Sequence, residues 1–526
     1  GHQFHVSLAM PVSALEQAIR TFADLPVTQV VTELDVTTGT PVSEALLIEQ
    51  GYYYRDAFRV FRENIDELYS VTVWGLTDGR SWRSANGAPL LFDDAYQGKP
   101  AFFGAVDEEL PARQRSAFVF GGSVPVDDAA PTAAEWDRLP LLPIEQSGAF
   151  QLRWEPGTLT AFVEVTDGSM DDADGVRFTV GDQEYVVGRD GEGDVTASVT
   201  ETDTGYRIVA ALPLGDAALG DVVRFDARIA DGDASAGWNT AGELGNLTLV
   251  EPLSFVEVVE AVDAPTIDGA VDDAWAAANA VTTDRQVEGT GGATASVRTL
   301  WQDNALFVLA EVADPVVDVS GSDPWIQDSV EIYVDAGNVK NGSYRYDDTQ
   351  IRISAAGAVS FGTGDEAFQR NRVESQVATV DGGYVVEARI SLLDSGGEGT
   401  FHGLDFQVND ASDGARTGIR NWADPTGAGY QSTARWGVGE LVAAEGTTPT
   451  EPGGPTTPTE PGTPGEPGTP TTPPANGGSD GGASGDPRNP LASTGGGLPF
   501  GLGLAGLLAL LAGAILVQRR RERMQG

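Results

Sequence analysis

The feature that most constrains the fold of this chain is the stretch from about residue 115 to about residue 445, in which short segments alternate apolar and polar residues. Turns rich in glycine and aspartate separate these segments, and few helical periods occur between them. Alternation with a period of two is typical of strands that bury one face. The pattern therefore predicts all-β sandwiches over this stretch.

The same stretch contains an internal repeat. Residues 162–167 echo residues 309–314, and residues 225–231 echo residues 404–410. A duplicated module is the simplest interpretation. We expect one copy over residues 115–252 and the other over residues 258–445.

The two copies differ in length. Asp167 and Tyr206 lie 39 positions apart in the first copy, whereas Asp314 and Tyr384 lie 70 positions apart in the second. The first copy therefore lacks a segment that the second contains.

Residues 1–107 follow a different pattern, in which strand and helix signals alternate. An apolar run at 28–31 predicts a buried strand, a helical period over about 43–67 predicts a long helix, and residues 71–74 predict a further strand. Strands that alternate with helices are typical of a parallel βα barrel.

Composition excludes some classes of partner. The chain has 78 acidic and 32 basic residues, and its formal net charge is −46. Nucleic-acid binding needs a basic surface, so we expect no nucleic-acid partner. The sequence has no cysteine, so disulfides cannot stabilise the fold.

The last part of the chain has two segments of unusual composition. Residues 446–490 consist mainly of Pro, Thr, Gly, Glu and Ser, which predicts a disordered spacer. Residues 498–517 form an apolar run, and Arg519, Arg520, Arg521 and Arg523 follow it. The run is long enough to cross a bilayer as a helix, with the arginines on the cytoplasmic side.

Residues 1–107 contain several short motifs, at residues 1–5, 31–36, 73–78, 81–82, 89–93 and 99–101. In this order and spacing, they resemble the last third of the family 10 glycoside hydrolases, the endo-1,4-β-xylanases. The resemblance implies that this region forms the last strands of a (β/α)₈ barrel, which needs about 250 residues in all. We therefore expect the chain to be a fragment of a longer protein.

The resemblance also implies a catalytic site. Glu33 matches the family's nucleophile, which attacks the sugar to form a covalent intermediate. The supporting polar network would be His5 and Asp35, and the substrate-binding residues would be Gln3, Trp74 and Trp82. The family's acid/base lies in an Asn-Glu pair on the fourth strand, upstream of residue 1. We therefore expect this chain alone to be inactive, and we expect no cofactor for catalysis.

The second copy, residues 258–445, resembles a family 9 carbohydrate-binding module. The motifs lie at residues 267–269, 324–331, 350–352 and 407–410, together with Trp275. The resemblance implies a site that grips the reducing end of a xylan- or cellulose-type chain between two aromatic rings. The implied site residues are Trp325, Glu331, Gln350, Arg352 and Tyr430.

This sequence departs from the family pattern at three positions. Tyr430 stands where the family has tryptophan, and Gly427 and Ser354 stand where asparagines are expected. Each lost hydrogen bond costs about 1 kcal/mol, so we expect weaker binding. The alternative is that Trp325 only fills the core of the sandwich.

The first copy, residues 115–252, reads as a diverged relative of the second. It has Trp136 and Trp154 but no segment equivalent to residues 324–331, so we expect a spacer or a site of altered specificity. The acidic run 171–175 is either a structural calcium site, as family 9 modules carry, or an ordinary turn.

The tail resembles a cell-wall sorting signal of the form used by high-GC actinobacteria. Leu-Ala-Ser-Thr-Gly at residues 491–495 precedes the apolar run and the basic end, so 491–526 would form the signal. A sortase would cut between Thr494 and Gly495 and join the protein to peptidoglycan. A permanent membrane anchor is the alternative.

Together these features predict a secreted, wall-attached, actinobacterial endo-1,4-β-xylanase with carbohydrate-binding modules. Its partners would be xylan and related plant polysaccharides, the sortase and the cell wall, with a transient membrane stage. One alternative is a non-catalytic surface protein that binds carbohydrate. Another keeps the fold but has cellulose-like or mixed-linkage glucans as substrate.

Overall fold

The structure is a computed structural model, and it describes residues 1–444 apart from a few positions. The residues left out within this range are Ala9, Pro11, Asp24, Asn341, Ser343, Thr363 and Asp365. The predicted linker 446–490, the sorting signal and the apolar run 498–517 lie outside the described residues. Within the described part of the chain, no helix is both long and apolar enough to span a membrane.

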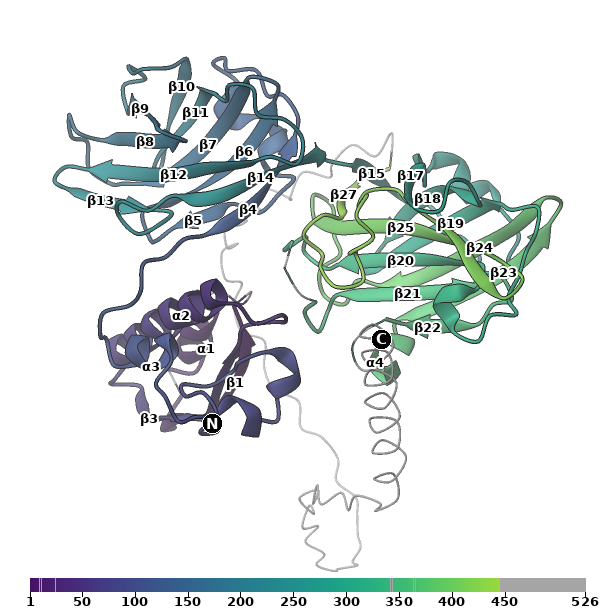
Figure 1. Ribbon diagram of the computed structural model, residues 1–526, viewed down its shortest axis with the longest axis horizontal. Helices are drawn as coiled ribbons and strands as arrows, with labels where there is room; N and C mark the ends of the chain where they lie inside the picture. The colour runs from purple at the N-terminus through teal and green to yellow at the C-terminus, as the bar shows by residue number, and fades with distance from the viewer. Residues whose placement is uncertain are drawn as a thin grey trace, which may run out of the picture. The chain divides into compact units, whose positions relative to one another are not determined.

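Residues 1–107 form a small parallel α/β unit. Its elements are β1 (His2–Ser7), α1 (Val12–Thr21), β2 (Gln29–Thr37), α2 (Glu44–Glu63), β3 (Leu68–Val73), the short turns η1 (Asp78–Arg80) and η2 (Ser84–Asn86), and α3 (Pro100–Ala105). The strands pair in the order β1-β2-β3, and both pairings are parallel. Apolar residues of α1 and α2 pack against β2 in one core. Figure 1 shows these helices beside the strands of the unit. The unit has the βαβ connectivity expected for part of a barrel.

Two element boundaries differ from those expected. The long helix ends at Glu63, because the chain turns at Asn64, whose backbone N–H caps the carbonyl of Val60. Ile65, which continued the helical period, is exposed instead. The third strand consequently begins at Leu68 rather than at residue 71.

Residues 116–252 form a curled sheet of 11 strands. The strands are β4 (Ser116–Gly121), β5 (Leu142–Ile144), β6 (Gly148–Glu155), β7 (Thr158–Thr166), β8 (Gly175–Val180), β9 (Gln183–Gly188), β10 (Ala197–Thr202), β11 (Gly205–Pro213), β12 (Val222–Asp231), β13 (Ala234–Gly237) and β14 (Gly245–Pro252). The short turns η3 (Ala130–Thr132) and η4 (Ala134–Trp136) precede β5. The strands enclose one apolar core, and we call this unit the first sandwich.

Residues 255–442 form a second curled sheet, of 13 strands, which we call the second sandwich. The strands are β15 (Phe255–Glu260), β16 (Ala280–Thr282), β17 (Arg285–Glu288), β18 (Thr294–Gln302), β19 (Ala305–Ala313), β20 (Ser329–Asp335), β21 (Thr349–Ser354), β22 (Val359–Phe361), β23 (Val373–Val380), β24 (Gly383–Ser391), β25 (Phe401–Ser412), β26 (Ala415–Asn421) and β27 (Gly437–Val442). The turns η5 (Asp273–Ala277) and η6 (Pro324–Ile326) and the helix α4 (Glu366–Arg370) connect them. These strands too surround an apolar core.

The two sandwiches share one order of strand pairing. The first runs β10-β11-β7-β6-β4-β14-β12-β8-β9, and the second runs β23-β24-β19-β18-β15-β27-β25-β20-β21 before it adds β22. The parallel pair β14–β4 has its counterpart in the parallel pair β27–β15. This common order is what a duplicated module produces, and it lets positions in one sandwich be matched to positions in the other.

Candidate functional sites

The parallel pairing of β1 with β2 assembles a polar cluster on one face of the first sheet. Gln3 lies opposite Glu33 in the register, and His5 lies opposite Asp35. Because residues two apart in a strand share a face, the four side chains lie on the same side of the sheet. The predicted nucleophile and its predicted network are therefore brought together.

His5 bridges the two carboxylates of this cluster. Its Nε2 lies 3.0 Å from Oε2 of Glu33, and its Nδ1 lies 2.7 Å from Oδ2 of Asp35. The side-chain amide of Gln3 donates a hydrogen bond to the other oxygen of Glu33. Hydrogen bonds to the charged form of a carboxylate favour that form, so this arrangement suits a nucleophile.

Arg83 belongs to the same network, although the sequence did not single it out. Its guanidinium donates to Oδ1 of Asp35 at 2.7 Å and to the carbonyl of Val6 at 2.9 Å. Asp35 is fully buried, and this ion pair compensates its charge. The position of Arg83 directly after Trp82 was the one available signal.

The two predicted substrate-binding tryptophans are both exposed. The ring of Trp82 meets His5 edge-on at 5.0 Å and is 66% exposed. Trp74 is 45% exposed, and its backbone N–H donates to the carbonyl of Leu34, next to Glu33. Both rings are therefore accessible from solvent.

The second acid in this network is Asp35. A retaining glycosidase needs two carboxyl groups about 5–5.5 Å apart, one as nucleophile and one as proton donor. Asp35, the other acid in the network, is held between His5 and Arg83 and has no exposed surface. Asp35 is therefore not accessible from solvent.

The five residues predicted for sugar binding line one pocket of the second sandwich, with a volume of about 410 Å³. Trp325 lies in η6, Glu331 in β20, and Gln350 and Arg352 in β21, while Tyr430 lies between β26 and β27. The structure thus gathers residues from four separate segments.

Glu331 organises the polar side of this pocket. It accepts hydrogen bonds from Arg352 Nε at 2.8 Å, Gln350 Nε2 at 2.5 Å, Asn409 Nδ2 at 2.7 Å and the hydroxyl of Tyr333 at 2.9 Å. Burial alone would raise the pKa of Glu331, but the charge of Arg352 and the donated hydrogen bonds lower it below its ordinary value. The carboxylate is therefore ionised and held rigid.

Two exposed rings form the aromatic side. Trp325 is 48% exposed and Tyr430 is 55% exposed, and both line the pocket. The alternative in which Trp325 only fills the core is wrong, because half of its surface is open to solvent.

Gln407 and Arg416 also line the pocket, and the sequence analysis did not name them as site residues. Arg416 donates to the carbonyl of Trp325 at 3.3 Å and pairs with Glu288 at 2.7 Å, so it ties the Trp325 turn to β17. Gln407 lies on the same face of β25 as Asn409, and this spacing of two was the available signal.

Two of the departures from the family pattern remove side-chain partners from the pocket. Gly427 has φ = 69°, and a Cβ there would lie 2.5 Å from Cγ1 of Val287. The hydroxyl of Ser354 is buried and accepts a hydrogen bond from the N–H of Ala358. Neither position offers a free polar group to a ligand.

Two regions of the chain match known families. Residues 1–108 match the model described as "Glycosyl hydrolase family 10", and residues 267–444 match "Carbohydrate family 9 binding domain-like". The chain carries a family 10 glycosyl hydrolase region and a family 9 carbohydrate-binding domain. The first sandwich lies between these two matched regions.

Several known proteins are similar to most of this chain. "Exoglucanase XynX" of Acetivibrio thermocellus is 31% identical over 83% of this chain and 43% of its own length. "Endo-1,4-beta-xylanase A" of Thermoanaerobacterium saccharolyticum is 32% identical over 83% of this chain and 41% of its own length. The chain thus spans less than half the length of these relatives.

Among solved structures, a family 9 module from Caldicellulosiruptor kristjanssonii in complex with cellotriose is similar to part of the chain. It is 33% identical, and the match covers 38% of this chain and 100% of that module, with a TM-score of 0.34.

The first sandwich has no counterpart of the family 9 sugar site. Its tryptophans, Trp136, Trp154 and Trp238, are all buried in its interior. The segment between Asp167 and β8 is shorter than the segment between Asp314 and β20, and among its described residues it contains no turn equivalent to η6. The aromatic wall supplied by Trp325 is therefore missing from the first sandwich.

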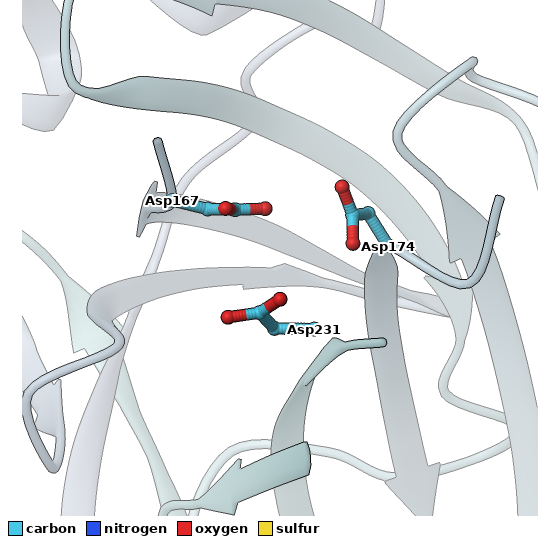
Figure 2. Close-up of side chains that lie close together, drawn as sticks. All are labelled: Asp167, Asp174 and Asp231. Carbon is cyan, nitrogen blue, oxygen red and sulfur yellow. The ribbon is translucent and has the colours of Figure 1, made fainter. Parts of the chain in front are cut away.

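Each sandwich contains a cluster of three aspartates whose carboxylate oxygens lie within 4.8 Å of one another. The first cluster is Asp167, Asp174 and Asp231, which Figure 2 shows facing one another; the second is Asp314, Asp328 and Asp410. Only Asp174 of the predicted run 171–175 belongs to the first cluster, since the other two members come from β12 and from the end of β7.

Proposed function

We propose that this chain is part of a retaining endo-1,4-β-xylanase that binds its polysaccharide through the family 9 domain. The observation that carries the proposal is the cluster of Gln3, His5, Glu33 and Asp35 in a family 10 region. Glu33 would attack the anomeric carbon, the bond to the leaving sugar would break, and water would then hydrolyse the glycosyl ester. The names of several similar proteins support xylan as substrate.

A mechanism-based xylosyl inactivator tests the role of Glu33. In a complete barrel that contains this region, we expect the inactivator to form an ester with Glu33, because His5 and Gln3 hold this side chain in place. Peptide mass spectrometry would locate the label. A label on any other side chain would contradict the proposed mechanism.

The proposal includes the absence of turnover by the 526-residue chain alone. A leaving sugar must be protonated, and within residues 1–444 as described Asp35 is too tightly paired to do so. We expect no release of reducing sugar from xylan or from a mixed-linkage glucan. Glu33→Gln is the control for contaminating activity; sugar release that this substitution abolishes would show that the chain holds its own acid/base.

A non-catalytic carbohydrate-binding protein is the second candidate function. One observation favours it: the family 9 pocket has its aromatic and polar sides in place. A bound sugar without any turnover in the full-length protein would support this candidate.

The proposal further includes secretion and attachment to the cell wall through residues 491–526. Its support is the Leu-Ala-Ser-Thr-Gly pattern followed by an apolar run and arginines. The proposed partners, a sortase and peptidoglycan, follow from that pattern.

We also propose a structural calcium ion in the family 9 domain. Calcium prefers six to eight oxygen ligands, and carboxylates are its commonest protein ligands. Asp314, Asp328 and Asp410 would hold the ion, which would neutralise their charges where β19, β20 and β25 meet. Burial, followed by the charges of Asp314 and Asp410, raises the pKa of Asp328 to about 7, which shows how poorly the cluster tolerates its own charge.

A further inference from the structure

The two aspartate clusters occupy matched positions in the shared strand order. Asp167 and Asp314 directly follow β7 and β19, and Asp174 and Asp328 directly precede β8 and β20. A tyrosine lies beside each cluster, Tyr206 at the start of β11 and Tyr384 at the start of β24. The duplicated module therefore carries one acidic cluster per copy.

The first cluster contains an arginine. Nη1 of Arg189 lies 3.2 Å from Oδ2 of Asp167 and 3.3 Å from Oδ2 of Asp174, so it bridges two of the three carboxylates. The rest of the guanidinium pairs with Glu201, at 2.7 Å and 2.9 Å, and lies over the ring of Tyr206. Arg189 is thus fixed on several sides with its charge inside the cluster.

The matched position in the second sandwich is Ala355. The backbone N–H of Arg189, just after β9, donates to the carbonyl of Asp174 at 2.9 Å. The N–H of Ala355, just after β21, donates to the carbonyl of Asp328 at 2.8 Å. The same backbone bond in both copies establishes that the two residues are equivalent, and an alanine can supply no charge.

Glu201, the carboxylate that pairs with Arg189, also has no charged equivalent in the second sandwich. Glu201 lies opposite Tyr206 in the β10–β11 register, and Thr379 lies opposite Tyr384 in the β23–β24 register. The second sandwich therefore lacks both the guanidinium and the carboxylate that would anchor it.

The second cluster consequently keeps uncompensated charge. Among the described residues, none of its three carboxylates forms an ion pair. In each cluster one carboxylate oxygen and the neighbouring tyrosine hydroxyl are buried without a hydrogen-bond partner: Oδ1 of Asp174 and Tyr206 in the first cluster, and Oδ2 of Asp314 and Tyr384 in the second. The clusters differ in the guanidinium, which pairs with carboxylates in the first cluster.

We propose that Arg189 takes, in the first sandwich, the place that a divalent cation takes in the second. The guanidinium bridges the carboxylates from within the chain, so the first sandwich needs no calcium and excludes it by charge repulsion. The two copies of the module thus neutralise their equivalent acidic clusters in different ways. This inference rests on the calcium ion proposed for the family 9 domain.

A reciprocal exchange of the two residues tests the inference. Full-length chain is stripped with a chelator, dialysed against calcium, and analysed for bound calcium per chain. We expect Ala355→Arg to lower the number of bound calcium ions per chain by one. We expect Arg189→Ala to raise this number by one, because the carboxylates of the first cluster then face each other without a cation. Arg177→Ala, which removes an exposed arginine from β8 outside the cluster, serves as the control and should change nothing.

Hydrogen–deuterium exchange keeps the test decisive if a variant fails to fold. In the wild-type chain, a chelator should speed exchange in β19, β20 and β25 and leave β7, β8 and β12 unchanged. Equal acceleration in both sandwiches, or a folded Arg189→Ala variant with an unchanged calcium count, would overturn the inference. Xylobiose affinity is measured on the same samples, to separate the proposed sugar binding from the proposed role of Arg189. If the calcium counts are as expected but xylobiose does not bind, only the proposed function is contradicted.

Discussion

Replacing Glu331 with glutamine is expected to destabilise the second sandwich by about 3–5 kcal/mol, because it leaves the buried guanidinium of Arg352 without a counter-charge. The new amide group would also face the donors of Gln350 and Asn409, which now donate to the carboxylate. Sugar binding should be lost with the fold of the pocket. The thermal transition that xylobiose shifts in the wild-type chain identifies the second sandwich and measures the effect.

Glu374→Gln is the matched control for this prediction. Glu374 is an exposed glutamate of β23 in the same sandwich, so its replacement should change stability by less than about 0.5 kcal/mol. If Glu331→Gln left the transition within the range of this control, Arg352 would not depend on Glu331, and the pocket would be organised in another way.

Replacing Trp325 with alanine should reduce the affinity for xylobiose by about 30-fold, which corresponds to about 2 kcal/mol for the loss of an aromatic anchor. Tyr430→Trp should change affinity in the opposite direction, because a larger ring offers more stacking area on the facing side of the pocket. Isothermal titration with xylobiose and with cellobiose measures both variants and shows which sugar the pocket prefers.

Tyr346→Ala controls for a general effect of removing an exposed ring. Tyr346 is 74% exposed in the same sandwich and does not line the pocket, so its removal should leave affinity unchanged. If Trp325→Ala bound xylobiose as tightly as this control, Trp325 would have no part in the site.

The sequence predicted those parts of each site that lie on single strands. Glu33 and Asp35, two positions apart, had to share one face of β2 once that segment was a strand. The same reasoning applies to Gln350 and Arg352 in β21. Motif resemblance then supplied the expected chemistry. The pocket contains the five residues named for it, and the Glu33 cluster brings together Gln3, His5, Glu33 and Asp35.

Contacts between distant segments escaped prediction. Arg83 reaches Asp35 and Arg416 reaches the Trp325 turn only because of tertiary packing, which no local spacing encodes. The aspartate cluster of the first sandwich draws its members from three strand ends, so the local run 171–175 indicated just one of them. The end of α2 was misplaced for a different reason: exposed Ile65 extended the apolar period past the point where Asn64 stops the helix.

The backbone at Gly427 limits how this pocket can evolve. A side chain there would have to adopt a left-handed φ and would displace Val287, so regaining a polar contact by substitution at that position carries a steric cost. Changes in sugar recognition are therefore expected at other residues that line the pocket, such as the exposed Tyr430 three positions further along the same loop. A natural or engineered lineage of this domain should accumulate its adaptive changes at those residues.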